Sequence, residues 1–121
     1  MFWEGINRRG FPRANYACVV ILRQKGSSEA FHTKTENIGC GGICVILPKE
    51  INLFGTVEVE LDLEDGETKI SCDGVAVWVV RRSEAGKDAS VCFDTGIEFA
   101  NLKEKDKGRI DKVIKRCLRQ K

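Results

Sequence analysis

The stretch from Gly55 to Leu63 alternates strictly between apolar and polar residues, and this period of two is that of a β-strand. Apolar side chains stand at every second position, at Val57, Val59, Leu61 and Leu63. Thr56, Glu58, Glu60 and Asp62 fill the positions between them. The pattern therefore predicts a strand with one buried face and one face in water.

Five other stretches have the composition of strands, being rich in β-branched and apolar residues between turn residues. They cover residues 14–25, 29–36, 43–47, 69–82 and 90–100. The first two are joined by a Gly-Ser-Ser turn and should form a hairpin. Three glycines within residues 39–42 indicate a sharp turn or a close approach to the backbone. Trp78, inside the apolar strand 69–82, is expected in the core.

The period changes near the end of the chain, where residues of about 103–118 predict a helix. Its apolar stripe is formed by Ile110, Val113, Ile114, Cys117 and Leu118. Asn101 followed by Glu104 has the spacing of a capping pair at a helix start. We interpret the basic residues on the opposite face as solvated surface charge.

Six strands and one terminal helix predict a mainly β fold, a small antiparallel barrel or closed sandwich with the helix packed against it. With 121 residues, of which 42% are hydrophobic, the chain fits one soluble domain. It contains no apolar run of the ~18 residues that a membrane helix needs, and its start lacks the pattern of a signal peptide. We expect a cytoplasmic protein without membrane insertion.

The residue types needed for metal binding or catalysis are poorly placed. The six cysteines include no CxxC pair, and His32 is the only histidine. Most of the cysteines stand among Val and Ile, so we interpret them as small buried hydrophobic residues. No paired carboxylates, activated nucleophile or phosphate-cradling loop with its lysine is present. We therefore expect neither an enzyme nor a bound metal or cofactor.

The segment 1–13 carries three arginines, Arg8, Arg9 and Arg13, within six residues. Gly10 and Pro12 disfavour helix and central strand there, so the segment should form a flexible arm. Each guanidinium is a planar fork of donors that suits a phosphate or the acceptor edge of guanine.

Charge is distributed unevenly along the chain. The net charge is +2, but residues 1–25 carry +4, residues 103–121 carry +6 and the segment between them carries −8. A generic nucleic-acid binder needs a broad basic surface for many phosphates. The distribution favours a small anionic ligand held at one place, and no DNA or RNA partner.

Two motifs stand in order along the chain, Arg9-x-x-x-Arg13 before the first strand and Asn37-x-Gly39-x-x-Gly42 between the second and third. Together they resemble the PilZ family of bacterial cyclic di-GMP receptors, whose signature is RxxxR followed by (D/N)xSxxG. Residues 74–82, 95–99 and 102–118 resemble the later strands and closing helix of that family. The resemblance extends over about residues 8–118.

The resemblance implies a six-stranded antiparallel, Greek-key-like barrel at residues 14–121, with the arm folding over a ligand at its rim. Arg9 and Arg13 would then hold the phosphates or guanines of cyclic di-GMP. Asn37 would face a guanine edge, and Gly42 would leave space for a base. Signalling would pass to an unknown protein partner through a conformational change on binding.

Two positions modify this expectation. The family's serine is Gly39 here, and the loss of one neutral hydrogen bond should weaken binding by around tenfold. Arg8 stands directly before RxxxR, where a basic residue in this family is associated with binding an intercalated pair of cyclic di-GMP molecules.

Two alternatives remain open. A degenerate PilZ-like adaptor would bind a protein and no nucleotide, which Gly39 favours and the intact arginine pair opposes. A barrel for single-stranded nucleic acid would need exposed aromatic platforms on its strands, and most of the aromatic residues fall on apolar faces.

Overall fold

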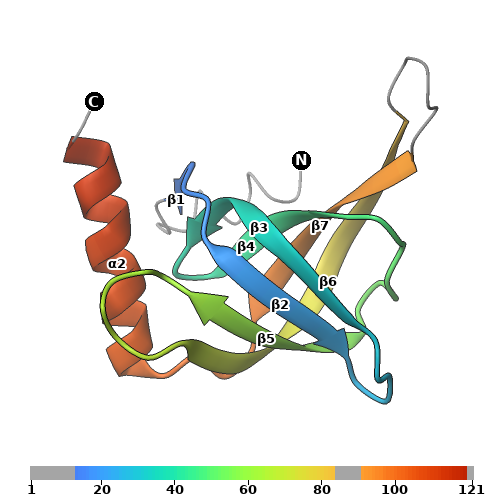
Figure 1. Ribbon diagram of the computed structural model, residues 1–121, viewed down its shortest axis with the longest axis horizontal. Helices are drawn as coiled ribbons and strands as arrows, with labels where there is room; N and C mark the ends of the chain where they lie inside the picture. Colours follow the sequence, from blue (N-terminus) through green and yellow to red (C-terminus); the bar gives the residue numbers. More distant parts are fainter. Residues whose placement is uncertain (1–12, 84–90, 120–121) are drawn as a thin grey trace.

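The computed structural model describes residues 13–83 and 91–119, which form seven strands and one helix (Figure 1). The elements in chain order are β1 (Arg13–Ala14), β2 (Val19–Gln24), β3 (Ala30–Gly39), β4 (Gly42–Leu47), β5 (Thr56–Asp62), β6 (Ile70–Ser83), β7 (Val91–Phe99) and α2 (Glu104–Arg119). The six predicted strands and the terminal helix all have counterparts among these elements.

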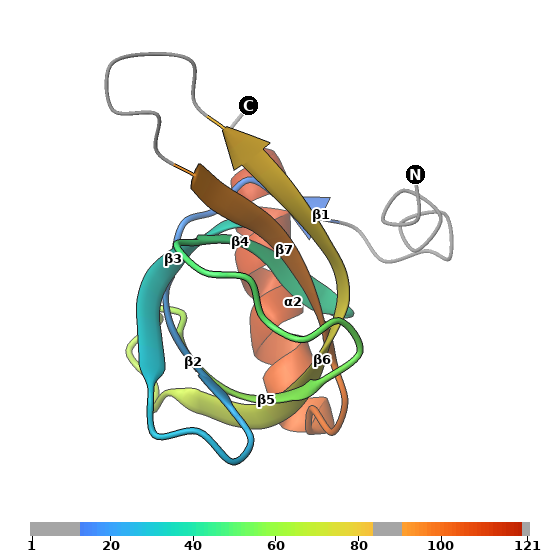
Figure 2. The same cartoon turned by 90° about the vertical axis from the view of Figure 1, so that its right-hand side faces the viewer.

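The strands form one antiparallel sheet in the order β1-β3-β2-β5-β6-β7-β4, and a further pairing of β3 with β4 closes it. Six strands therefore make a closed barrel, which confirms the predicted fold class. The two-residue strand β1 lies outside the ring and pairs with the end of β3. Figure 2 looks into the barrel, with α2 lying across its far end.

The stretch predicted as one strand at 14–25 is divided into β1 and β2, which both pair with β3. The side chain of Thr35, on β3, lies at the division. Its hydroxyl donates to the carbonyl of Tyr16 at 2.5 Å and accepts from the amide of Cys18 at 3.0 Å. The Thr35 side chain thus replaces part of the backbone hydrogen bonding along β3. The pairing of β3 with β4 has a register irregularity between Thr35 and Asn37.

The core is formed by the inward faces of the strands and by the helix. The alternation at 55–63 is confirmed, because its four apolar residues are at most 2% exposed and Glu58 is exposed. Burying such side chains is the main favourable term in folding. The core residues from the other strands include Val20, Leu22, Ile38, Ile43, Val45, Leu47, Ile70 and Ile97.

The helix α2 covers one end of the barrel with its apolar stripe. Ile110, Val113 and Ile114 are at most 4% exposed and belong to the core. Leu118 was expected to share this stripe, but it is 47% exposed and lies in the last turn of the helix. Among the described residues, no helix has the length and apolar character needed to cross a membrane.

The helix begins differently from the prediction. The Oδ1 atom of Asn101 accepts from the amide of Asp73 at 2.7 Å, so this side chain binds β6 and does not cap the helix. The carbonyl of Lys103 accepts from the amides of Asp106 and Lys107 at 3.0 and 2.9 Å. Lys103 therefore occupies the N-cap position, and the acidic Asp106 in the first turn interacts favourably with the helix dipole.

Four of the six cysteines are less buried than expected. All six are free thiols. The interpretation as small buried residues holds for Cys18 and Cys44, which are 1% and 8% exposed. Cys40, Cys72 and Cys117 are partly buried and pack against the core, and Cys92 is also partly buried.

An ion-pair network joins α2 to the loop between β5 and β6. Arg109 donates to both carboxylate oxygens of Asp65 at 3.0 and 2.9 Å, and to Asp106 at 3.2 Å. It also donates to the carbonyl of Thr68 at 2.7 Å. The three charged side chains are only 12 to 15% exposed, so the bonds are largely shielded from water. Arg109 therefore fixes the helix on the barrel.

Replacing Arg109 by alanine should lower the free energy of unfolding by about 3 kcal/mol, because it leaves Asp65 and Asp106 without their partner. Lys115→Ala is the matched control, since it breaks an exposed pair with Asp111 on the same helix. That control should cost less than about 0.5 kcal/mol in urea unfolding at pH 7. Equal costs for the two variants would show that the network contributes no more than a surface pair.

The same comparison has a defined pH dependence. The hydrogen bonds from Arg109 hold the pKa of Asp65 below its ordinary value of 3.8. A carboxylate with a lowered folded pKa stabilises the protein above its ordinary pKa, and this contribution disappears as the pH falls through the folded value. The difference in the free energy of unfolding between the parent protein and Arg109→Ala should therefore be largest at pH 7 and decrease below about pH 4.

Candidate ligand-binding site

Four strands place a row of paired residues on the outer face of the barrel. Asn37 on β3 pairs with Cys44 on β4, Cys44 pairs with Gly96 on β7, and Gly96 pairs with Trp78 on β6. Directly paired residues point to the same side of a sheet. The inward neighbours Ile43 and Ile97 belong to the core, so the row lies on the outside. We call these four residues the outer row.

Arg13 lies at one end of the outer row. Its backbone pairs with Gly39 through β1, and its side chain reaches Asn37. The Nε atom donates to Oδ1 of Asn37 at 2.8 Å, and Nη2 donates to the same oxygen. The short β1–β3 pairing therefore brings together two residues that stand 24 positions apart in the sequence.

The guanidinium of Arg13 is largely removed from water. This desolvation lowers its pKa to about 10, so the group is still charged at neutral pH. A desolvated cation interacts more strongly with an anion than a solvated one does, because water screens it less. Arg13 is thus held by Asn37 as a charged guanidinium that is largely shielded from water.

Cys44 lies between Asn37 and Gly96 and is 8% exposed. Burial, together with the negative charge of Asp94, raises the pKa of its thiol to about 11. The thiolate is the reactive form of cysteine. At neutral pH the thiol is therefore protonated, and it serves as a small uncharged part of the surface and not as a nucleophile.

Trp78 forms the other end of the outer row. It is half-buried and lies outside the core, contrary to the expectation from its apolar strand. The β6–β7 pairing steps from Ala76 with Ile97 directly to Trp78 with Gly96, so Val77 is an extra residue in a bulge. Because a bulge reverses the alternation of faces, Trp78 points outward where a regular strand would point it inward.

The indole of Trp78 lies directly over Gly96. A Cβ atom built on Gly96 would stand 2.3 Å from the indole Nε1 and 2.4 Å from Cε2. Any larger residue at this position would displace the ring. Gly96, in the predicted strand 90–100, was the sequence signal for this arrangement. The residue opposite it could not be identified from sequence, because the register of β6 against β7 was unknown.

The other predicted ligand residues fall in different places. Gly39 and Gly42 are buried and pair with each other, on either side of a two-residue turn between β3 and β4. Arg8 and Arg9 lie outside the described residues. The structure therefore brings together Arg13, Asn37, Gly39 and Gly42. Trp78, which the sequence had assigned to the core, lies at the other end of the outer row.

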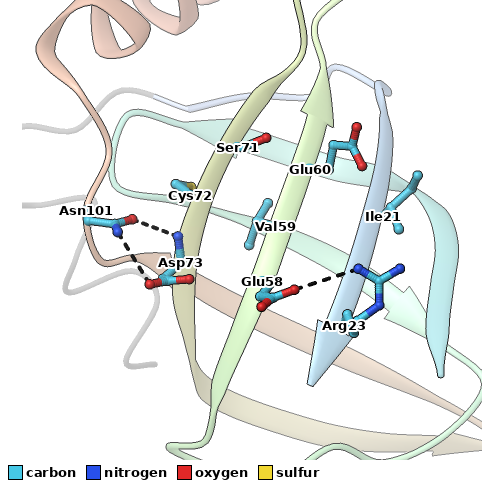
Figure 3. A pocket seen from close by; sticks show the side chains of 9 residues that line it. All are labelled: Ile21, Arg23, Glu58, Val59, Glu60, Ser71, Cys72, Asp73 and Asn101. Atoms are coloured by element: carbon cyan, nitrogen blue, oxygen red, sulfur yellow. Dashed lines mark hydrogen bonds and ion pairs between the residues drawn. The ribbon is translucent and has the colours of Figure 1, made fainter. Parts of the chain in front are cut away.

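A separate hollow of about 410 Å³ lies on the outer face of β2, β5 and β6 (Figure 3). Arg23 pairs there with Glu58 at 3.7 Å, and Asn101 binds Asp73. The residues that line it are Ile21, Arg23, Glu58, Val59, Glu60, Ser71, Cys72, Asp73 and Asn101. Three carboxylates against one arginine disfavour a ligand that carries phosphates.

Comparison with known proteins agrees with the sequence motifs. The family model described as PilZ domain matches residues 7–118, which is nearly the whole chain. The chain belongs to the PilZ domain family. A comparison with curated proteins found no match.

Solved structures of similar fold cover most of this chain. The inhibitor of motility MotI/DgrA of Bacillus subtilis superposes with a TM-score of 0.71 at 19% identity, over 93% of this chain and 51% of its own. The PilZ domain of YcgR from Escherichia coli, solved with c-di-GMP, gives 0.71 at 12% identity over 93% of both chains. The K. pneumonia MrkH–c-di-GMP complex gives 0.70 at 19% identity, over 94% of this chain and 56% of its own. This chain thus spans about half the length of MotI/DgrA and MrkH.

Proposed function

We propose that this protein is a receptor for cyclic di-GMP that binds the nucleotide on the outer row and presents an altered surface to a partner protein. The observation that carries the proposal is the Arg13–Asn37 pair on the outside of a PilZ barrel. The YcgR and MrkH structures that share the fold contain c-di-GMP, which supports the same ligand class here.

Arg13 and Asn37 have complementary roles in this proposal. The Oδ1 atom of Asn37 accepts from Arg13, which holds the guanidinium in place. Within residues 13–83 and 91–119 the amide nitrogen of Asn37 makes no hydrogen bond, so it can donate to the guanine acceptors O6 and N7. Arg13 can bind a phosphate or stack on a purine ring. The pair can therefore contact both the phosphates and the guanine bases of cyclic di-GMP.

Trp78 extends the site at the far end of the outer row. Its indole lies over Gly96, and an aromatic ring of this kind can stack on a purine. Arg82 and Asp94 form an ion pair of 3.4 Å beside this end of the row. Arg8 and Arg9 would approach from the arm at 1–13, with Arg9 binding the same ligand as Arg13. Nothing in this arrangement calls for catalysis, so the ligand would be released unchanged.

The proposal is tested by calorimetric titration of the protein with cyclic di-GMP, with cyclic di-AMP as the matched control. Adenine replaces the O6 acceptor of guanine by an amino donor, so the control should bind at least about tenfold more weakly. A stoichiometry of two ligands per chain would support the assignment of Arg8 to an intercalated pair. A stoichiometry of one would remove that assignment and leave the receptor proposal intact.

The second candidate is a PilZ-type adaptor that binds a protein without nucleotide. Gly39 favours it, because the position lacks the side chain that the family signature supplies. Gly39 is also buried and pairs with Arg13, so the missing hydroxyl lies beside the proposed ligand. The absence of measurable heat at high micromolar cyclic di-GMP would favour the adaptor and contradict the receptor.

A further inference from the structure

A second surface lies on α2, away from the outer row and built from none of its residues. A hollow of about 460 Å³ lies where the helix meets the loop between β5 and β6. Its helix side is formed by Lys105, Gly108, Lys112 and Arg116, together with the paired Arg109. Steps of three and four residues place these side chains on one face of the helix. We call Lys105, Lys112 and Arg116 the basic stripe.

The basic stripe differs from the other flank of the same helix in its ion pairs. Lys107 is paired with Glu104 at 3.1 Å, and Lys115 is paired with Asp111 at 3.0 Å. Within residues 13–83 and 91–119, the three members of the basic stripe make no ion pair, and all three are exposed. Their positive charge is therefore available to a partner.

Gly108 lies in the middle of the basic stripe and has no packing role. A Cβ atom built on it would meet nothing within 4 Å. Glycine inside a helix makes the helix less stable than alanine does. Gly108 therefore destabilises α2, and no neighbouring side chain requires a glycine there. It does, however, leave the helix backbone open to close approach. Two helices that cross at a small residue can pack with their axes near the lower end of the usual 8–10 Å range.

Charge limits what can occupy this surface. From Lys105 to Arg116 the basic stripe is about 16 Å long, given the rise of a helix per residue. Asp65 and Glu67 form the opposite wall, and the segment 26–102 as a whole carries −8. Asp65 is paired with Arg109, so within the described residues the hollow holds three basic side chains without an ion pair against the carboxylate of Glu67. This local excess of positive charge favours a short acidic element, whereas a long polyanion such as a nucleic acid would extend onto the acidic remainder of the chain.

We propose that the basic stripe and Gly108 form a docking surface for an acidic helix of a partner protein. Carboxylates at helical spacing on the partner would face Lys105, Lys112 and Arg116, and the partner backbone would approach at Gly108. Complementary charge of this kind mainly sets the choice of partner and the rate of association. The proposal does not depend on nucleotide binding at the outer row.

The test uses a fluorescein-labelled, alanine-rich peptide of 18 residues with glutamate at positions i, i+4, i+7 and i+11, measured by fluorescence anisotropy. The triple variant Lys105→Gln, Lys112→Gln, Arg116→Gln should bind at least about tenfold more weakly than the parent protein. The matched control Lys103→Gln, Lys107→Gln, Lys115→Gln removes the same charge from the same helix region and should stay within twofold. If both triple variants bind the peptide equally weakly, the proposal is overturned, because the peptide is then attracted only by the overall positive charge of the helix.

Two further measurements separate the helix from other partners. Gly108→Gln adds a good helix former that fills the hollow, so it should raise the melting temperature and weaken peptide binding at least fivefold. Unchanged binding in this variant would overturn the role of Gly108. A single-stranded oligonucleotide of equal charge that binds more tightly than the peptide would overturn the partner class.

Discussion

Replacing Arg13 by alanine is expected to weaken the binding of cyclic di-GMP by about a hundredfold. Hydrogen bonds to charged groups contribute about 1.5–3 kcal/mol each, and a guanidinium can make two of them to one phosphate. Arg13 is also desolvated, which strengthens its attraction for an anion. Calorimetric titration of the parent protein and the variant measures this difference directly.

Arg23→Ala is the matched control for this experiment. Arg23 lies on the outer face of β2, where it pairs loosely with Glu58 at 3.7 Å and is 46% exposed. Its removal changes the net charge by the same amount and should alter the affinity less than twofold. Arg13→Ala should change the free energy of unfolding by less than about 1 kcal/mol, because the loss of the hydrogen bonds to Asn37 is offset by removal of a desolvated charge.

The double variant Arg9→Ala, Arg13→Ala gives the sharper result. If both arginines bind the ligand, no binding should be measurable at micromolar concentration. If the double variant binds cyclic di-GMP nearly as tightly as the parent protein, the RxxxR arginines do not bind the ligand. Loss of affinity in Arg23→Ala as large as in Arg13→Ala would instead indicate that only net charge matters.

The assignment of Arg13 and Asn37 to one site came from the two motifs of the family resemblance, and neither their direct contact nor the place of Trp78 could be read from sequence. The contact depends on the short β1–β3 pairing, which joins segments 24 residues apart. The direction of Trp78 depends on one extra residue in β6, at the bulge between Ala76 and Trp78. A bulge leaves no mark in an apolar run, because every residue of that run is equally suited to either face.

The same limit explains the two local errors at Thr35 and Asn101. Both are small polar residues whose side chains can replace a backbone partner. Thr35 interrupts the first predicted strand by bonding to Tyr16 and Cys18, and Asn101 bonds to Asp73 instead of capping α2. In each case the competing partner is distant in the sequence, so local propensity could not identify it. The barrel and the helix stripe were predictable because their periodic patterns extend over many residues.

Gly42 shows how one motif residue can have a structural reason that sequence does not reveal. The resemblance to the PilZ family implied that this glycine leaves space for a base. In the structure a Cβ atom built on Gly42 would stand 2.1 Å from the carbonyl oxygen of Ile97, on β7. The neighbouring atom is backbone and belongs to the pairing of β4 with β7. The glycine is therefore required for closing the barrel, and its part in ligand binding stays a prediction.

Gly42→Ala should consequently lower the free energy of unfolding by about 3 kcal/mol or more, since overpacking against backbone cannot be relieved by a side-chain rotation. Urea unfolding at pH 7 measures the loss, and failure of the variant to fold would be its extreme form. Gly108→Ala is the matched control, because its added methyl group meets nothing within 4 Å. The control should stabilise the protein by about 0.5–1 kcal/mol, as expected for alanine in place of glycine in a helix.

The two substitutions are chemically identical, so their opposite signs would isolate the close approach of β4 and β7 as the cause. β4 is also the strand that pairs with Asn37 and Gly39 on β3. A shift of β4 away from β7 should therefore disturb the Arg13–Asn37 pair, and cyclic di-GMP affinity should fall together with stability. A Gly42→Ala variant that keeps the stability of the parent protein but loses the ligand would instead assign this glycine to the binding site, as the family resemblance implied.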